Sequence, residues 1–140
     1  MVIASSVIFT LCDNASIRDG LLSVLSSGVN QIVRSEFPDE LASYVAIQLQ
    51  IEGFGDGDTF VIEVVVTDMD GTPTEVADFS VDFTDSLSAD QSFPFTFPFV
   101  LDARQLPVPA AQPYRMALKL NGTELSHFVY YGVLMETPAT

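Results

Sequence analysis

The chain has 140 residues, of which 48% are hydrophobic, which suits one domain with its own core and argues against disorder. Nineteen acidic residues against five basic ones give a formal net charge of −14, so nucleic acid and anionic membrane surfaces are disfavoured as partners. The single cysteine, Cys12, excludes an internal disulfide and suits a reducing compartment, so we expect a cytoplasmic protein.

The N-terminal quarter contains one clear strand and one ambiguous segment. Val2–Leu11 is rich in β-branched residues and predicts a strand that ends at Asp13-Asn14, and it is too short to cross a bilayer. In Ser16–Val33, apolar residues recur near helical spacing, but glycines and serines interrupt the pattern. The alternatives are therefore a helix and a hairpin, and we favour a hairpin of Leu21–Leu25 and Val29–Arg34 with its turn between them.

The middle of the chain predicts three strands after a break at Phe37-Pro38. Leu41–Glu52 alternates with a repeat of two, which predicts a strand with one face in water. The two faces are Val45, Ile47, Leu49 and Ile51 on one side, and Ala46, Gln48, Gln50 and Glu52 on the other. Thr59–Asp68 is a nearly continuous β-branched run, typical of a central, buried strand. Asp70-Gly71 then predicts a hairpin turn into Thr74–Thr84, where Ala77, Phe79, Val81 and Phe83 are expected to face inward.

The C-terminal part predicts an edge strand and a closing hairpin. Phe93–Val100 reads Phe-Pro-Phe-Thr-Phe-Pro-Phe-Val, and because proline cannot donate to a ladder this segment should lie at a sheet edge. Asp102–Pro113 is a loop that carries prolines. Tyr114–Leu120 and Thr123–Leu134 should pair around Asn121-Gly122, a strong two-residue turn signal.

These segments together predict an all-β fold, a mainly antiparallel two-sheet β-sandwich of eight to nine strands. Residues 1–135 should form a single domain and residues 136–140 a loose C-terminal tail.

Several stretches resemble an uncharacterised bacterial family of small β-sandwich proteins, a domain-of-unknown-function family of similar length. The residues that carry the resemblance are Leu11–Ala15, Asp19–Leu25, Phe37-Pro38, Val45–Ile51, Asp68–Gly71 and Tyr114–Phe128. The resemblance implies the sandwich fold over most of the chain and supplies no activity.

Residues for catalysis or transition-metal binding are scarce. His127 is the only histidine, and one histidine with one cysteine is too few for a zinc or iron site. No Gly-x-Ser-x-Gly elbow is present, so we expect His127 to be structural and the protein not to be an enzyme.

Calcium stays an alternative because the chain is so acidic. No Lys or Arg occurs between Ser35 and Ala103, a stretch that holds fifteen acidic residues. Asp56-Gly57-Asp58 and Asp68-Met69-Asp70 lie at opposite ends of one predicted strand and cannot share an ion, although Asp68–Asp70 could meet Asp13 or Asp85–Asp90. Turn chemistry alone also explains Asp-Gly.

The predicted edge strand is the candidate interaction surface, through Phe93, Phe95, Phe97 and Phe99. In an extended chain these rings share one face, where they could complete the domain's own core or dock a protein partner, a second copy included. The expected function is thus a non-enzymatic protein–protein interaction or structural module without a cofactor. The alternative is a ligand- or calcium-binding sandwich that uses Asp-rich loops.

Overall fold

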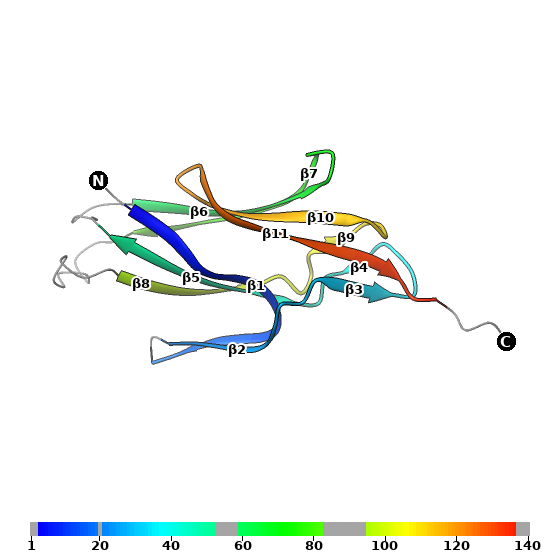
Figure 1. Cartoon of the computed structure of the whole chain (residues 1–140), viewed down its shortest axis with the longest axis horizontal. Coiled ribbons are helices and arrows are strands. Elements are labelled where there is room, and N and C mark those ends of the chain that lie inside the picture. The colour runs from blue at the N-terminus through cyan, green and yellow to red at the C-terminus, as the bar shows by residue number, and fades with distance from the viewer. Residues whose placement is uncertain (1–2, 20, 53–58, 83–94, 137–140) are drawn as a thin grey trace.

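Strands make up the fold wherever the structure describes the chain. The computed structural model describes residues 3–19, 21–52, 59–82 and 95–136, with the backbone alone at positions 3, 59, 74–82 and 95. The strands are β1 (Ile3–Arg18), β2 (Leu21–Ser27), β3 (Gln31–Arg34), β4 (Asp39–Glu40), β5 (Tyr44–Glu52), β6 (Thr59–Asp68), β7 (Pro73–Asp82), β8 (Phe95–Asp102), β9 (Pro107–Val108), β10 (Pro113–Leu120) and β11 (Thr123–Leu134) (Figure 1). These ranges contain no helix, and hence none suited to crossing a membrane.

Two sheets form a sandwich. One has the strand order β2-β1-β5-β8 and the other the order β3-β11-β10-β6-β7, while β4 and β9 form a small separate pair. Every described pairing is antiparallel except that of β3 with β11. The predicted all-β, mainly antiparallel two-sheet sandwich is confirmed, with nine strands in the two main sheets of the described chain.

The core between the sheets follows the alternation with a repeat of two. Its buried side chains include Val45, Ile47, Leu49 and Ile51 of β5, Phe60, Ile62, Val64 and Val66 of β6, and Tyr114, Met116, Leu118 and Leu120 of β10. Strand β6 lies between β10 and β7, as a central strand should. Its burial is one-sided, because Val61 on the other face is exposed.

The two predicted Gly turns are confirmed. Asn121 and Gly122 both have positive φ, 49° and 83°, and connect the paired residues Leu120 and Thr123. Gly71, with a φ of 85°, lies in the turn between β6 and β7. The predicted inward facing of Ala77, Phe79, Val81 and Phe83 lies outside the described side chains, and the predicted tail lies mostly outside the described residues.

Strand β1 does not end at Asp13-Asn14, contrary to the prediction, but continues to Arg18. Residues 3–12 pair with β5, and residues 12–18 pair with β2. The strand changes partner at a corner where the amides of Gly28 and Val29 both donate to the carbonyl of Leu11, at 3.0 and 3.2 Å. Beyond this corner the second half of β1 and the whole of β2 form a hairpin that lies at the bottom of Figure 1, on the opposite side of β5 and β8 from the second sheet.

The expected hairpin of Leu21–Leu25 with Val29–Arg34 is therefore wrong, although both segments are strands and not a helix. Strand β2 pairs with β1, while β3 pairs in parallel with β11. Only two residues, Asp and Gly, separate the paired Arg18 and Leu21, and Asp19 has a φ of 53°. An Asp-Gly pair is itself a signal for a hairpin turn, but we had expected the turn later in the chain, between Leu25 and Val29.

The returning hairpin also covers a face that was expected to be in water. Cys12, Ala15 and Ala46 are buried in a second small cluster, and Leu22 and Val24 of β2 pack against it. The prediction of a wet outer face for β5 is wrong at Ala46, because alternation along one strand carries no information about a hairpin folded over it.

Candidate functional site

The predicted phenylalanine edge lies on β8, at one end of the four-stranded sheet in the described chain. Phe97 and Phe99 are half-buried, pack against the main core, and have ring centroids 5.7 Å apart. Phe93 lies outside the described residues, and the side chain of Phe95 is not described. The two described rings thus serve the domain's own core, and a docking role for this set stays a prediction.

The opposite end of the same sheet carries exposed aliphatic side chains. Leu21 is 71% exposed, Leu25 is 63% exposed and Ile17 is 47% exposed. Strand β2 alternates, so that Leu21, Ser23 and Leu25 point outward while Leu22 and Val24 are half-buried. The sequence Leu21–Leu25 does not alternate between apolar and polar residues, so its outward side could be assigned only once the hairpin was placed.

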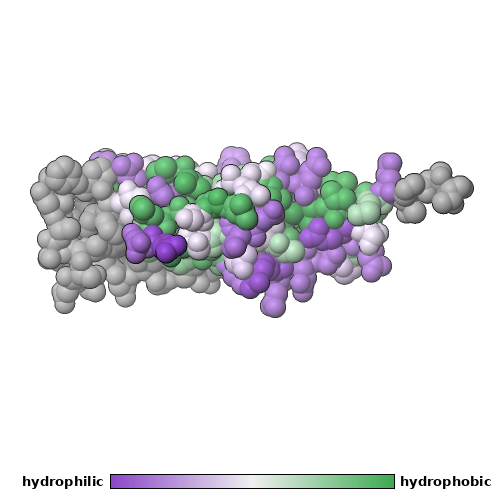
Figure 2. Space-filling view, turned by 90° about the horizontal axis from the view of Figure 1, so that it is seen from below, coloured by the Kyte–Doolittle hydropathy of each residue, from purple (hydrophilic) through white to green (hydrophobic). Residues whose placement is uncertain are grey.

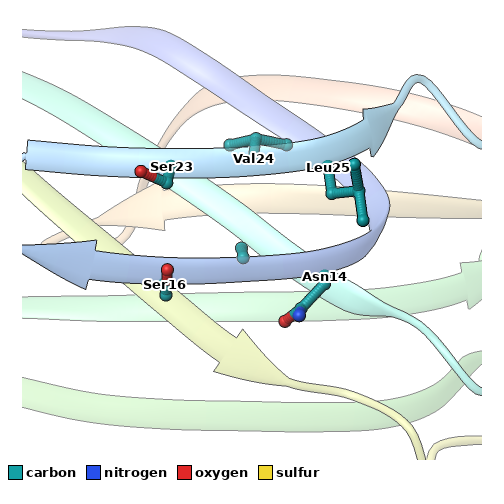
Figure 3. A pocket seen from close by; sticks show the side chains of 6 residues that line it. Asn14, Ser16, Ser23, Val24 and Leu25 are labelled. Atoms are coloured by element: carbon teal, nitrogen blue, oxygen red, sulfur yellow. The ribbon is translucent and has the colours of Figure 1, made fainter.

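A shallow hollow of about 280 Å³ lies on the hairpin (Figure 3). It is lined by Asn14, Ala15, Ser16, Ser23, Val24 and Leu25. Most of these side chains are small, so the hollow exists because little fills the space beside Leu25. Seen from the β2 side in Figure 2, apolar and polar side chains are interspersed on this face of the molecule. The hollow therefore offers an apolar surface for contact, with the hydroxyl groups of two serines and the amide group of Asn14 beside it.

A polar groove lies where the loop after β8 meets the small β4–β9 pair. One hollow of about 370 Å³ is lined by Glu40, Asp102, Arg104 and Gln105. A neighbouring hollow of about 440 Å³ shares Glu40 and Gln105 with it. The backbone holds the two walls together, since the amides of Leu41 and Ala42 donate to carbonyls of Leu106 and Arg104 at 2.8 and 2.9 Å.

Arg104 and Asp102 form an ion pair in this groove. The Arg104 guanidinium donates to both carboxylate oxygens of Asp102, at 2.9 and 2.8 Å, and lies 5.0 Å from the centre of the Tyr44 ring. These side-chain hydrogen bonds, helped by the Arg104 amide, lower the pKa of Asp102 to about 2. On the far wall Arg34 lies 3.4 Å from Asp39 and donates to the carbonyls of Glu40 and Leu41. The sequence had not pointed to this groove, because its lining residues come from two segments, 38–40 and 102–107, that lie far apart in the chain.

His127 lies on the outer face of the second sheet. Its Nδ1 is 3.5 Å from a Glu124 oxygen, and the same oxygen accepts a 2.7 Å hydrogen bond from Arg115. Half of the imidazole surface is exposed. The arrangement is a surface charge cluster without a hydroxyl or thiol nucleophile in it.

The acidic loops divide between the described and undescribed parts of the chain. Asp56–Asp58 and Asp85–Asp90 lie outside the described residues. Asp68 uses its Oδ1 to accept the amides of Asp70 and Thr72, each at 2.9 Å, so this oxygen serves the turn. Within the described residues no three His, Cys, Asp or Glu side chains gather as a metal site would require.

Comparison with known proteins identifies a family and supplies no activity. The model of a family described as "Family of unknown function (DUF6941)" matches residues 7–131. No curated protein sequence matches the chain. Solved structures that match the chain include a β-glucosidase from Listeria innocua, with TM-score 0.48 and 10% identity over 96% of this chain. The same enzyme in complex with glucose matches with TM-score 0.49 and 12% identity over 95% of this chain. An immunoglobulin-like protein from Pseudomonas aeruginosa has TM-score 0.35 and 10% identity, and the match covers 94% of this chain and 96% of that one. The match spans only 16% of the length of the β-glucosidase.

Proposed function

We propose that this chain, which belongs to DUF6941, a family of unknown function, is a non-enzymatic module. It binds protein chains through an edge of its four-stranded sheet. The observation that carries the proposal is the exposure of Leu21 and Leu25 on β2, a strand without a charged residue in a chain of net charge −14. An edge strand offers backbone donors and acceptors that another extended chain satisfies.

The exposed leucines supply a driving force of useful size. Full burial of one leucine side chain contributes about 1.5–3 kcal/mol. Because about two thirds of each of the two side chains is exposed, covering both would contribute roughly 2–4 kcal/mol. This contribution would add to that of the backbone hydrogen bonds between the strands, and it favours a protein partner over a small ion.

The polar groove supports a non-enzymatic role. A general acid or base works best with a pKa near the working pH, whereas Arg104 shifts the pKa of Asp102 down to about 2. A carboxylate held ionised by a bidentate arginine serves structure or recognition. The free and buried Cys12 is in keeping with a reducing compartment such as the cytoplasm.

Site-specific photo-crosslinking in the producing organism tests the proposal. A benzophenone amino acid placed at Leu21 should give covalent adducts with protein. The matched control is the same substitution at Met69, which is 58% exposed. Met69 lies in the turn after β6, a strand of the other sheet. Adducts at position 21 and few at position 69 support the proposal. No protein adduct at position 21, or equal labelling at both positions, contradicts it.

A further inference from the structure

We infer that the partner of β2 is β2 of a second copy of this chain, paired antiparallel about a twofold axis at Ser23. The inference rests on the proposed function and names its partner. It starts from the free edge of β2, which pairs with β1 on one side and with no described strand on the other.

The other edge strands of the described sheets carry features that discourage pairing with another chain, and β2 carries none. Strand β8 contains Pro98, and β7 begins at Pro73 and holds three acidic residues. Strand β3 is only four residues long and ends at Arg34. Strand β2 has seven residues, Leu-Leu-Ser-Val-Leu-Ser-Ser, with no proline, no charge and no register shift against β1. Natural edge strands use such devices to prevent pairing, so their absence from this one edge marks it as a strand that is covered in use.

The sequence of β2 fits a copy of itself. Residues 21–25 read Leu-Leu-Ser-Val-Leu, which has the same apolar–polar pattern in both directions around Ser23. In an antiparallel pair centred on Ser23, Leu21 of one copy lies opposite Leu25 of the other, and Leu22 lies opposite Val24. Directly opposite side chains in an antiparallel pair have Cβ atoms about 4.5–5.5 Å apart. Each exposed leucine thereby gains an apolar partner, while serine meets serine at the axis.

Both faces of the hairpin agree with this register. Leu21 and Leu25 are the two exposed leucines of the outward face, and this pairing brings them together twice, once on each side of the axis. On the inward face, Leu22 and Val24 are half-buried against the second cluster, so their remaining exposed surface would meet the same residues of the other copy. A register shifted by one or two residues in either direction would no longer place Leu21 opposite Leu25, so both leucine pairs would be lost.

Substitution of Ser23 by a charged residue tests whether Ser23 lies on the twofold axis of a dimer. Ser23 is exposed, so Ser23→Lys and Ser23→Glu leave the single chain folded, as far-ultraviolet circular dichroism and thermal melting would verify. In the dimer each substitution puts like charges directly opposite each other. Sedimentation equilibrium of the full chain should show that wild type reaches twice the chain mass as its concentration rises. Each variant should weaken this association by about tenfold or more, and an equal mixture of the two should restore it as a heterodimer.

Controls separate this inference from the proposed function. Met69→Lys and Met69→Glu add the same charges on an exposed turn and should leave the association unchanged. Added salt should strengthen the dimer, because two copies of net charge −14 repel at low ionic strength. A crosslink from position 21 should map to the peptide that contains Leu25 of the other copy.

The outcomes are distinct. Wild type that stays at single-chain mass, or a dimer that Ser23→Lys and Ser23→Glu leave intact, overturns the inference. Crosslinks from position 21 that reach other proteins only would also overturn it, while the proposed function would stand. No crosslinks at all would remove both.

Discussion

Replacing Gly132 with alanine should destabilise the fold through one specific contact. Gly132 lies in β11 under the loop that joins β9 to β10, and its φ lies outside the left-handed region. A Cβ built there would be 2.6 Å from the carbonyl oxygen of Ala110 and 3.3 Å from a methyl group of Val108. The cost therefore comes from contact and not from backbone strain.

The size of the effect follows from how firmly the carbonyl is held. To reach an ordinary contact distance of 3.4 Å, the oxygen must move by about 0.8 Å relative to the new methyl group. The Tyr114 hydroxyl accepts the Ala110 amide at 3.0 Å and donates to the Ala110 carbonyl at 3.3 Å, while the Gly132 amide donates to Gln112 at 2.9 Å. Overpacking of this kind costs about 1–3 kcal/mol, which corresponds to roughly 3–10 °C in melting temperature for a domain of this size.

Thermal and urea unfolding of Gly132→Ala measure this loss. A double-mutant cycle with Tyr114→Phe tests its cause, because removal of the hydroxyl frees the Ala110 loop to move. Gly132→Ala should then cost less in the Tyr114→Phe background than in wild type. A melting temperature within about 1 °C of wild type, or a cost that is the same in both backgrounds, would refute the reasoning.

Three further predictions concern single polar groups. The buried hydroxyl of Tyr130 has no hydrogen-bond partner in the described structure, so Tyr130→Phe should leave the urea midpoint unchanged or raise it, and a clear drop would show a partner. Burial also raises the pKa of Tyr130. Because the unfolded phenol ionises near pH 10 while the folded one stays neutral, the free energy of unfolding of the wild type should fall above about pH 10. The free energy of unfolding of Tyr130→Phe should fall less steeply over the same pH range. The Asp102 carboxylate should titrate by NMR with a pKa of about 2. Its pKa lies below the ordinary value, so the effect of the Arg104 pair is present above about pH 4 and lost as the pH falls toward 2; Arg104→Gln should return the midpoint to the ordinary range, and no change would contradict the pairing. Asp68→Ala removes the acceptor of two turn amides and should lower the free energy of unfolding by about 1–2 kcal/mol, whereas a loss below about 0.3 kcal/mol would mean that water replaces the carboxylate.

The sequence predicted the fold best where a local signal decides the outcome. Asn121-Gly122 fixes a two-residue turn, so both strands of the closing hairpin were predicted to within one residue. Alternation in β5 identified its buried face correctly because that face meets the main core. These features depend on residues that lie close together in the chain, so the local sequence pattern predicts them.

The pairing of β1 and β2 could not be predicted in the same way. The corner at Leu11 depends on amides seventeen and eighteen residues later in the chain, Gly28 and Val29. The parallel contact of β3 with β11 joins residues about a hundred positions apart. The polar groove has the same origin, since Glu40 and Arg104 are brought together by tertiary structure. Long-range placement, and not local propensity, therefore decided which strands would be edges.

The two edges of the four-stranded sheet explain why association through β2 would stop at two copies. A twofold interface uses the same strand from each copy, so pairing leaves no free β2 edge. The combined sheet would then end in β8 on both sides. Strand β8 carries Pro98 within it and Asp102 at its end, and its described rings pack against the core instead of facing a partner. Because a proline and a terminal charge discourage further strand addition, the same sheet combines one edge suited to pairing with one that limits growth.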